Sequence, residues 1–163
     1  MACSIVLIAT CRVGSVEWCI REIGDVLYAL DSNVVVEEAG FPGVLFVRSC
    51  LSVERVYRRA ISSEYGFVEN IIPVHGSASL EDFLRDPGVI LRNLVYPGRV
   101  KIKIRMRGVR GLSRILFARV AEVLRSMGVT HDPSSPTCLF IEGVGGVVYL
   151  GVGLCKSVRR SLV

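Results

Sequence analysis

The segment VKIKIRMRGVRGLSR, residues 100–114, has the clearest chemical pattern in the sequence. Every second residue of its first half is apolar, which predicts a strand over 99–107 with one buried face. The remaining positions carry a row of cations, and further arginines follow beside two glycines. The candidate phosphate-binding residues are Arg99, Lys101, Lys103, Arg105, Arg107, Gly108, Arg110, Gly111, Ser113 and Arg114. No acidic residue interrupts this run, so it is suited to binding a polyanion.

The loop that follows the predicted strand strengthens this interpretation. Gly108 and Gly111 allow backbone N–H groups to approach a ligand closely, and Ser113 is predicted to cap a helix whose N-terminus favours anions. The flanking guanidinium groups match the geometry of phosphate oxygens. The spacing fits neither a Walker loop nor G-x-G-x-x-G, so no nucleotide cofactor is predicted. No aromatic residue interleaves the cations, so we expect recognition of phosphates and shape on this face.

A cationic strand also has a purely structural explanation. Lysines on an edge strand discourage pairing between sheets, and the proteins of thermophiles have charge-rich surfaces. Both explanations predict mixed charges or one or two lysines. They account less well for five cations followed by Arg110 and Arg114. We therefore favour anion binding and keep edge protection as the alternative.

Charge is distributed unevenly along the 163 residues. Residues 1–98 hold 8 basic and 12 acidic side chains, a net charge of −4, whereas residues 99–163 hold 12 and 3, a net charge of +9. This division predicts two units with different roles, of which the second attracts a polyanion. No apolar run reaches the ~18 residues of a membrane span. The N-terminus lacks the basic start of a signal peptide, so we expect a cytoplasmic protein without membrane attachment.

The hydrophobic pattern predicts an α+β protein with two units. Residues 1–76 are predicted to fold in the order βαββαβ, with helices that begin after Ser15 and Ser52, which is typical of a ferredoxin-like unit. Residues 77–98 are predicted to form a linker helix or helix pair, broken at Asp86-Pro87-Gly88, that packs with the second unit.

The second unit is predicted to be an α/β unit with its core at residues 99–155. Its predicted elements are a strand at 99–107, a helix at 113–127, and a hairpin of strands at 138–142 and 147–152. Residues 156–163 are predicted to be a loosely held basic tail.

The sequence contains six cysteines and two histidines. The cysteines are Cys3, Cys11, Cys19, Cys50, Cys138 and Cys155. None forms a C-x-x-C pair, so no metal site is predicted. They fit small buried apolar residues in a reducing compartment. However, the chain has no glutamine and 17 arginines against 3 lysines, a composition typical of thermophiles, in which intracellular disulfides form. Their pairing therefore stays open.

Residues that could carry covalent or acid–base chemistry are few. The stretch from Cys50 to Arg55 is one residue shorter than the C-x5-R loop of phosphatases. His75 is expected to pack at a turn, and His131 is expected to pack as well, although contact with a nucleotide is its alternative. Trp18, Tyr28 and Phe117 are expected to pack in the core. No catalytic residue is predicted.

The order helix, basic strand, helix and hairpin resembles a THUMP domain, an RNA-binding module of tRNA-modifying enzymes. The resemblance rests on KIKIRMRGVRGLSR leading into a helix and on MGVTHDPSSPTCLFIEGVGGVVYLGV. Within the latter, the matching positions are Gly128-Val129, Asp132-Pro133, Glu142 and Tyr149-Leu150-Gly151. Upstream, GFPGVLFVRS and IIPVHG resemble the ferredoxin-like part that precedes THUMP in many of its proteins. The layout is similar to the tRNA cytidine-acetylation adaptor family, which has no catalytic domain of its own.

The resemblance implies a non-catalytic protein that binds tRNA and presents it to a separate modifying enzyme, such as an acetyltransferase, without a cofactor. A SAM-type glycine loop, a P-loop and a zinc-deaminase motif are absent from the sequence. Only eleven residues follow Val152, which is too few for a catalytic domain. One alternative is an assembly module or homo-oligomer, favoured by the mean hydropathy of +0.50. The other is a small ferredoxin-like hydrolase, which requires a polar catalytic pair that the first unit lacks.

Overall fold

The computed structural model describes residues 3–160. Its contacts divide the chain into two compact units. Unit 1 comprises the residues up to Val74 together with those from Lys156 onward, and unit 2 is His75–Cys155. No helix in the described range is long and apolar enough to cross a membrane.

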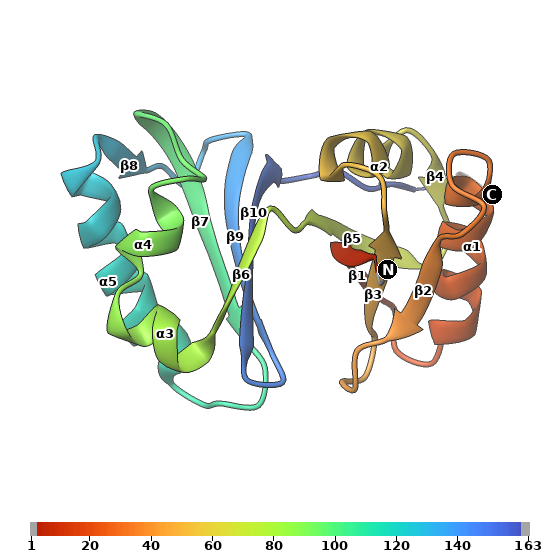
Figure 1. Ribbon diagram of the computed structural model, residues 1–163, viewed down its shortest axis with the longest axis horizontal. Helices are drawn as coiled ribbons and strands as arrows, with labels where there is room; N and C mark the ends of the chain where they lie inside the picture. The colour runs from red at the N-terminus through yellow and green to blue at the C-terminus, as the bar shows by residue number, and fades with distance from the viewer. Residues whose placement is uncertain (1–2, 161–163) are drawn as a thin grey trace. The chain divides into compact units, whose positions relative to one another are not determined.

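Unit 1 contains a four-stranded antiparallel sheet with two helices. Its elements are β1 (Ser4–Cys11), α1 (Val16–Tyr28), β2 (Val35–Glu38), β3 (Val44–Ser49), α2 (Val53–Ile61), β4 (Glu64–Tyr65) and β5 (Val68–Pro73). The strand order β2-β3-β1-β5 is the one that a βαββαβ chain adopts in a ferredoxin-like sandwich. The predicted fold of the first unit is therefore confirmed (Figure 1).

The helices of unit 1 form where apolar residues recur at helical spacing. Cys19, Ile23 and Leu27 of α1 are buried and pack into the same core as α2 and β1. Ser52 caps α2 as predicted, since its Oγ accepts the N–H of Arg55 at 3.3 Å.

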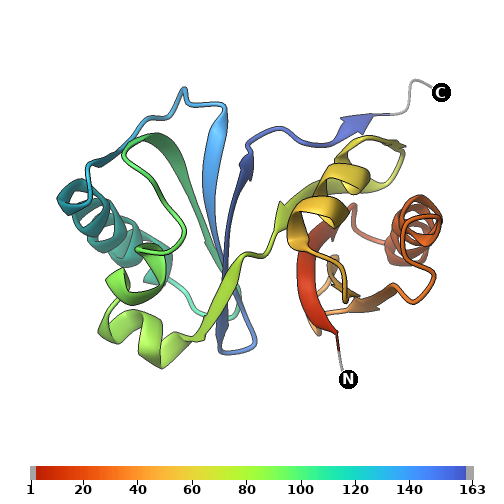
Figure 2. The same ribbon diagram turned by 45° about the horizontal axis from the view of Figure 1, so that its top comes forward.

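The end of the chain returns to unit 1. Its last strand, β11 (Arg159–Arg160), pairs in parallel with β4, and Figure 2 shows this blue strand beside the yellow part of the unit. Ser157 Oγ donates to the carbonyl of Ile71 at 3.1 Å, and Arg160 Nη1 donates to that of Val68 at 3.2 Å. Up to residue 160, the predicted loose tail is therefore an ordered part of the first unit. Unit 1 then holds nine basic and nine acidic side chains, and unit 2 holds eleven and six.

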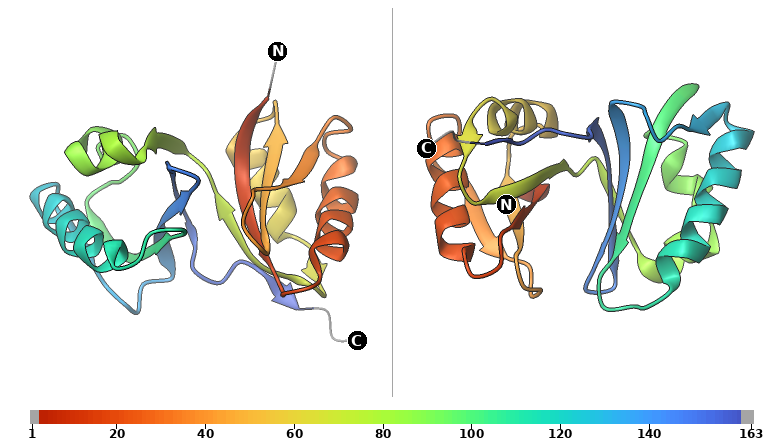
Figure 3. Two further views of the ribbon diagram at one scale, coloured as in Figure 1. Left: turned by 90° about the horizontal axis from the view of Figure 1, so that it is seen from below. Right: turned by 180° about the vertical axis from the view of Figure 1, so that it is seen from behind.

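Unit 2 contains a five-stranded mixed sheet. Its elements are β6 (Gly76–Ser79), α3 (Leu80–Arg85), α4 (Gly88–Leu91), β7 (Gly98–Met106), α5 (Leu112–Ser126), β8 (Val129–His131), β9 (Thr137–Val144) and β10 (Val147–Leu154). The strand order is β6-β10-β9-β7-β8, with β7 parallel to both of its neighbours. The three helices lie on one face of this sheet (Figures 1 and 3). The opposite face carries no helix of unit 2.

The predicted linker over 77–98 differs from the structure in its first part. It begins as the edge strand β6, which pairs with β10, and belongs to unit 2. The helical part then follows as a pair, α3 and α4, separated at Asp86 and Pro87 as predicted. Ser79 ends the strand and caps α3, since its Oγ accepts the N–H of Asp82 at 3.1 Å.

All six cysteines pair within their own units. The disulfides are Cys3–Cys50, Cys11–Cys19 and Cys138–Cys155, with Cα atoms 4.7, 6.3 and 5.0 Å apart. The structure therefore selects the disulfide alternative over free thiols.

Candidate nucleic-acid interface

Strand β7 presents its cations on the sheet face without helices. Val100 and Ile102 are only 8% and 5% exposed and pack in the core that contains α5. Because side chains alternate along a strand, Lys101, Lys103 and Arg105 point to the opposite face. Arg105 is exposed there and the two lysines are half-buried. The alternation predicted from the sequence thus places three of the candidate residues together.

The outer edge of β7 is only partly paired. The short strand β8 pairs with Gly98–Val100. Beyond that point the side chain of His131 replaces a backbone partner, since its Nδ1 accepts the N–H of Ile102 at 3.0 Å. The His131 ring also packs edge-on against Phe117, with centroids 4.9 Å apart. His131 therefore has the packing role that was expected. An open edge gives the edge-protection alternative a structural basis for the lysines of β7.

The structure corrects the position of Arg107. This side chain is only 11% exposed, and its Nη1 donates to Glu142 Oε2 at 2.8 Å. Burial raises the pKa of Glu142, and the Arg107 guanidinium lowers it in part. The prediction that the Arg107 side chain lies in solvent is therefore wrong, because its guanidinium pairs with a buried carboxylate. Sequence reasoning missed the acid because it is 35 residues away, on the strand that pairs with β7.

The loop from Arg107 to α5 ends on glycine rather than serine. Gly108 and Gly111 both have positive φ, 87° and 76°. Gly111 occupies the N-cap of α5, so the predicted cap at Ser113 is wrong by two residues and Ser113 lies in the first turn. No side chain caps this helix, and its first turn contains no acidic residue. No acidic side chain of that turn therefore offsets the partial positive charge of the free N–H groups at its N-terminus.

Four of the candidate cations make no ion pair within the described part of the chain. Within residues 3–160, Arg99 forms an exposed ion pair with Asp132 at 3.7 Å, and Arg107 pairs with Glu142. Over the same range, Lys101, Arg105, Arg110 and Arg114 make no ion pair, and the three arginines are exposed. We call these four residues the cationic surface. They follow one another from β7, through the loop, to the first turn of α5.

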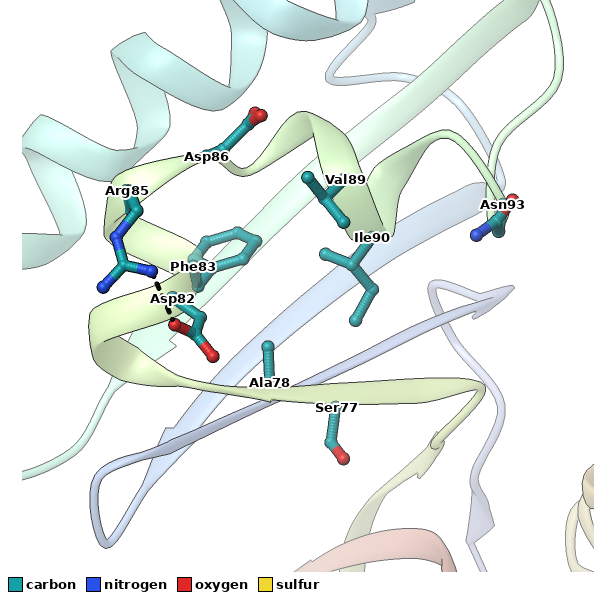
Figure 4. A pocket seen from close by; sticks show the side chains of 9 residues that line it. All are labelled: Ser77, Ala78, Asp82, Phe83, Arg85, Asp86, Val89, Ile90 and Asn93. Atoms are coloured by element: carbon teal, nitrogen blue, oxygen red, sulfur yellow. Dashed lines mark hydrogen bonds and ion pairs between the residues drawn. The ribbon is translucent and has the colours of Figure 1, made fainter.

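A separate pocket of about 460 Å³ lies in unit 2 between β6, α3 and α4 (Figure 4). Its lining includes Phe83 and Ile90, and its one cation, Arg85, pairs with Asp82 at 3.2 Å and with Glu81 at 3.3 Å. None of the cationic surface residues lines it. In the described part of the chain, no three His, Cys, Asp or Glu side chains gather where they could hold a metal ion.

Comparison with known proteins supports the fold. No protein-family profile and no curated protein matches the sequence. Among solved structures, the chain is similar to PH1313 from Pyrococcus horikoshii Ot3, with a TM-score of 0.63 and 15% identity over 94% of this chain and 55% of that one. TrmN from Thermus thermophilus gives a TM-score of 0.70 and 20% identity over 94% and 46%. A 4-thiouridine synthetase, in a complex with RNA and ATP, gives 0.54 and 11% over 94% and 42%.

These similarities show the fold. The chain spans about half the length of the structures that it matches. Each similarity covers 94% of this chain and therefore extends over both of its units. The chain therefore has the fold predicted from its sequence, a ferredoxin-like unit followed by a THUMP unit.

Proposed function

We propose that this protein is a non-catalytic tRNA-binding protein of the cytoplasm that presents tRNA to a separate modifying enzyme, such as a cytidine acetyltransferase. One observation carries the binding step. Lys101, Arg105, Arg110 and Arg114 make no ion pair within the described residues and lead to an uncapped helix N-terminus. Such a series of cations and N–H donors suits the regularly spaced phosphates of a nucleic acid.

The edge-protection alternative explains only part of this arrangement. It accounts for lysines on the open half of β7. It does not account for Arg110, which lies in the loop, or for Arg114, which lies on a helix. Neither residue is on a strand edge, so neither prevents pairing between sheets. Anion binding explains both sets of cations together.

The choice of RNA is supported by the shared fold and by the neighbour whose structure contains RNA. The choice of tRNA, and of a separate enzyme, is supported by the family resemblance of the sequence. In this proposal, the domain that modifies the bound tRNA belongs to a different protein. The 4-thiouridine synthetase is itself an enzyme, and this chain matches 42% of its length.

A salt titration tests the polyanion step. Labelled bulk tRNA is titrated with the protein at several salt concentrations, and binding is followed by fluorescence anisotropy. Four to five phosphate contacts predict a slope of log K against log salt of roughly −3 to −4.5, at about 0.7–0.9 per contact. A slope near zero would show that the cationic surface does not meet phosphates.

Gel filtration separates the proposal from the assembly alternative. An RNA-binding protein elutes earlier in the presence of tRNA, and the shift disappears at high salt. A homo-oligomeric module elutes at one position that tRNA does not change. The separate enzyme is tested by asking whether the protein raises the rate at which an acetyltransferase modifies the bound tRNA.

A further inference from the structure

Unit 1 carries an exposed aromatic cluster. Trp18 was expected to pack in the core, but it is 54% exposed, and Val13 in the preceding loop is 90% exposed. The indole stacks on Phe67, with ring centroids 5.7 Å apart and planes 18° from parallel. One aromatic ring therefore supports the other, and much of the indole stays accessible to a ligand.

The support under Trp18 is rigidly held. The Glu22 carboxylate accepts the backbone N–H groups of Gly66, Phe67 and Val68 at 2.6, 2.8 and 3.2 Å. The N–H of Arg12 donates to the carbonyl of Phe67 at 3.2 Å. Phe67 is thus tied both to α1 and to the loop before α1. An aromatic platform that is fixed before binding loses little conformational entropy when a ligand stacks on it.

Two arginines flank this platform. The Arg21 guanidinium lies over the Trp18 ring in a cation–π contact, 5.5 Å from the ring centroid, and Arg12 is exposed in the loop. Neither makes an ion pair with a carboxylate of residues 3–160. Trp18 itself lies in the first turn of α1, whose N-cap, Ser15, makes no side-chain capping hydrogen bond. Guanidinium and helix N–H donors therefore lie beside the accessible indole, and Glu17 is the acid in the same turn.

We propose that Arg12, Val13, Trp18, Arg21 and Phe67, the Trp18 cluster, bind one unpaired nucleotide of an RNA strand. The base stacks on the indole, and its phosphate is contacted by Arg12 or Arg21 and the first turn of α1. A paired base in a helix hides its faces in the stack, so only an unpaired nucleotide fits. An apolar protein segment would use the indole but leave both guanidinium groups without an anionic partner. This site is on the other unit from the cationic surface and adds base contacts to phosphate contacts.

Trp18 is the single tryptophan of the chain, so its fluorescence reports on this site alone. The full-length protein is titrated with an oligouridylate of about eight nucleotides, a length within the usual site size of single-strand binders. Occupancy is measured independently by anisotropy of the labelled RNA. We expect the tryptophan emission to be quenched in proportion to occupancy. Duplex RNA of the same length should bind the cationic surface without quenching. Occupancy by the single strand with unchanged emission would overturn the proposal and leave the proposed function standing.

Variants provide the second test. Trp18→Ala should lower affinity for the single strand about fivefold to a hundredfold, the usual effect of losing one stacked base. Trp18→Phe should recover part of that loss, and the affinity for duplex RNA should be unchanged in both variants. Tyr28→Ala is the matched control, since Tyr28 is 65% exposed on the last turn of the same helix. Equal losses in Trp18→Ala and Tyr28→Ala, with folding verified by circular dichroism, would overturn the proposal.

Discussion

Two strand-to-helix loops, one in each unit, have similar local structure but are stabilised by different interactions. The β1–α1 loop of unit 1 and the β7–α5 loop of unit 2 each join a strand to a helix, and each contains arginine. Each also has a glycine at positive φ, 81° at Gly14 and 76° at Gly111, and neither helix has a side-chain cap. The first loop is clamped by the Cys11–Cys19 disulfide and the second by the Arg107–Glu142 ion pair.

The surrounding charge differs as well. The first turn of α1 contains Glu17, whereas the first turn of α5 contains no acid and includes Arg114. Unit 1 has a net charge of zero and unit 2 a net charge of +5. In both proposals, a strand–loop–helix connection supplies the place for an anion. We propose that the charge around the connection decides between a weak site for one nucleotide in unit 1 and a surface for several phosphates in unit 2.

The largest expected effect comes from breaking the clamp of the second loop. Arg107→Glu places two carboxylates in a site where the side chains are 11% and 7% exposed. Loss of a buried partner typically costs about 3–5 kcal/mol of folding free energy. Denaturant unfolding measures the change in folding free energy. Arg105→Glu is the control, because Arg105 is exposed on β7, two residues before Arg107. Similar stability of the two variants would show that the ion pair does not hold the loop.

The clamp of the first loop is expected to contribute somewhat less. Cys11 and Cys19 are 8 residues apart, and a disulfide that closes so short a loop stabilises a protein by roughly 2.5 kcal/mol in the chain-entropy estimate. The variant with both cysteines replaced by alanine should therefore lose about that amount, measured by thermal unfolding without reductant. Mass spectrometry of the unreduced, alkylated protein should find no free thiol in the wild type. Six alkylated cysteines would contradict all three disulfides.

The sequence predicted most of the strands and helices that flank these two loops. Helical spacing located α1 and α2, the βαββαβ order predicted the sheet of unit 1, and alternation along 99–107 located the exposed face of β7. These features are local, because side-chain period and capping chemistry depend on neighbouring residues. The lysines on the sheet face of β7 opposite its buried residues followed from the same pattern.

Two of the errors concern pairings between distant residues, and two are local. The partner of Arg107 is 35 positions downstream, and β11 pairs with a strand almost a hundred positions upstream. The Ser113 cap was displaced by Gly111, because a glycine at positive φ ends the loop earlier. Trp18 was assigned to the core from its helix alone. Helical spacing could have corrected this, since Trp18 lies beside the row of Cys19, Ile23 and Leu27 and not within it.

A smaller effect is expected from the cations that we propose contact phosphate. Arg110→Glu should weaken tRNA binding about tenfold and lower the magnitude of the salt slope by about one unit, since one phosphate contact is removed. Arg55→Glu and Arg58→Glu are matched controls, because both arginines are exposed on α2 of the neutral unit. Their effect on affinity should stay within about twofold, in the range of surface charges outside a site. Equal losses from all three reversals would place the RNA path over α2 as well and remove the contrast between the units.

The smallest expected effect is a pH dependence of RNA affinity that arises from Glu142 in unit 2. Burial raises the pKa of Glu142, and the cations Arg107, Arg105 and Lys103 oppose that rise. As the pH falls toward this raised pKa, Glu142 takes up a proton and the positive potential beneath β7 increases. Bound phosphates favour the protonated form further, so binding takes up protons and tightens at lower pH.

Uptake of a single proton limits the gain to less than about tenfold per pH unit. Glu142→Gln keeps the shape of the side chain and removes its titration, so the variant should show a shallower rise in affinity between neutral and mildly acidic pH. The histidines are common to both proteins, and the difference between the two slopes therefore isolates Glu142. Anisotropy titrations at constant ionic strength measure both slopes. Identical slopes would mean that the phosphates lie too far from Glu142 to sense its charge, and the RNA path would then follow Arg110 and Arg114 instead of the face of β7 that carries Lys101 and Arg105.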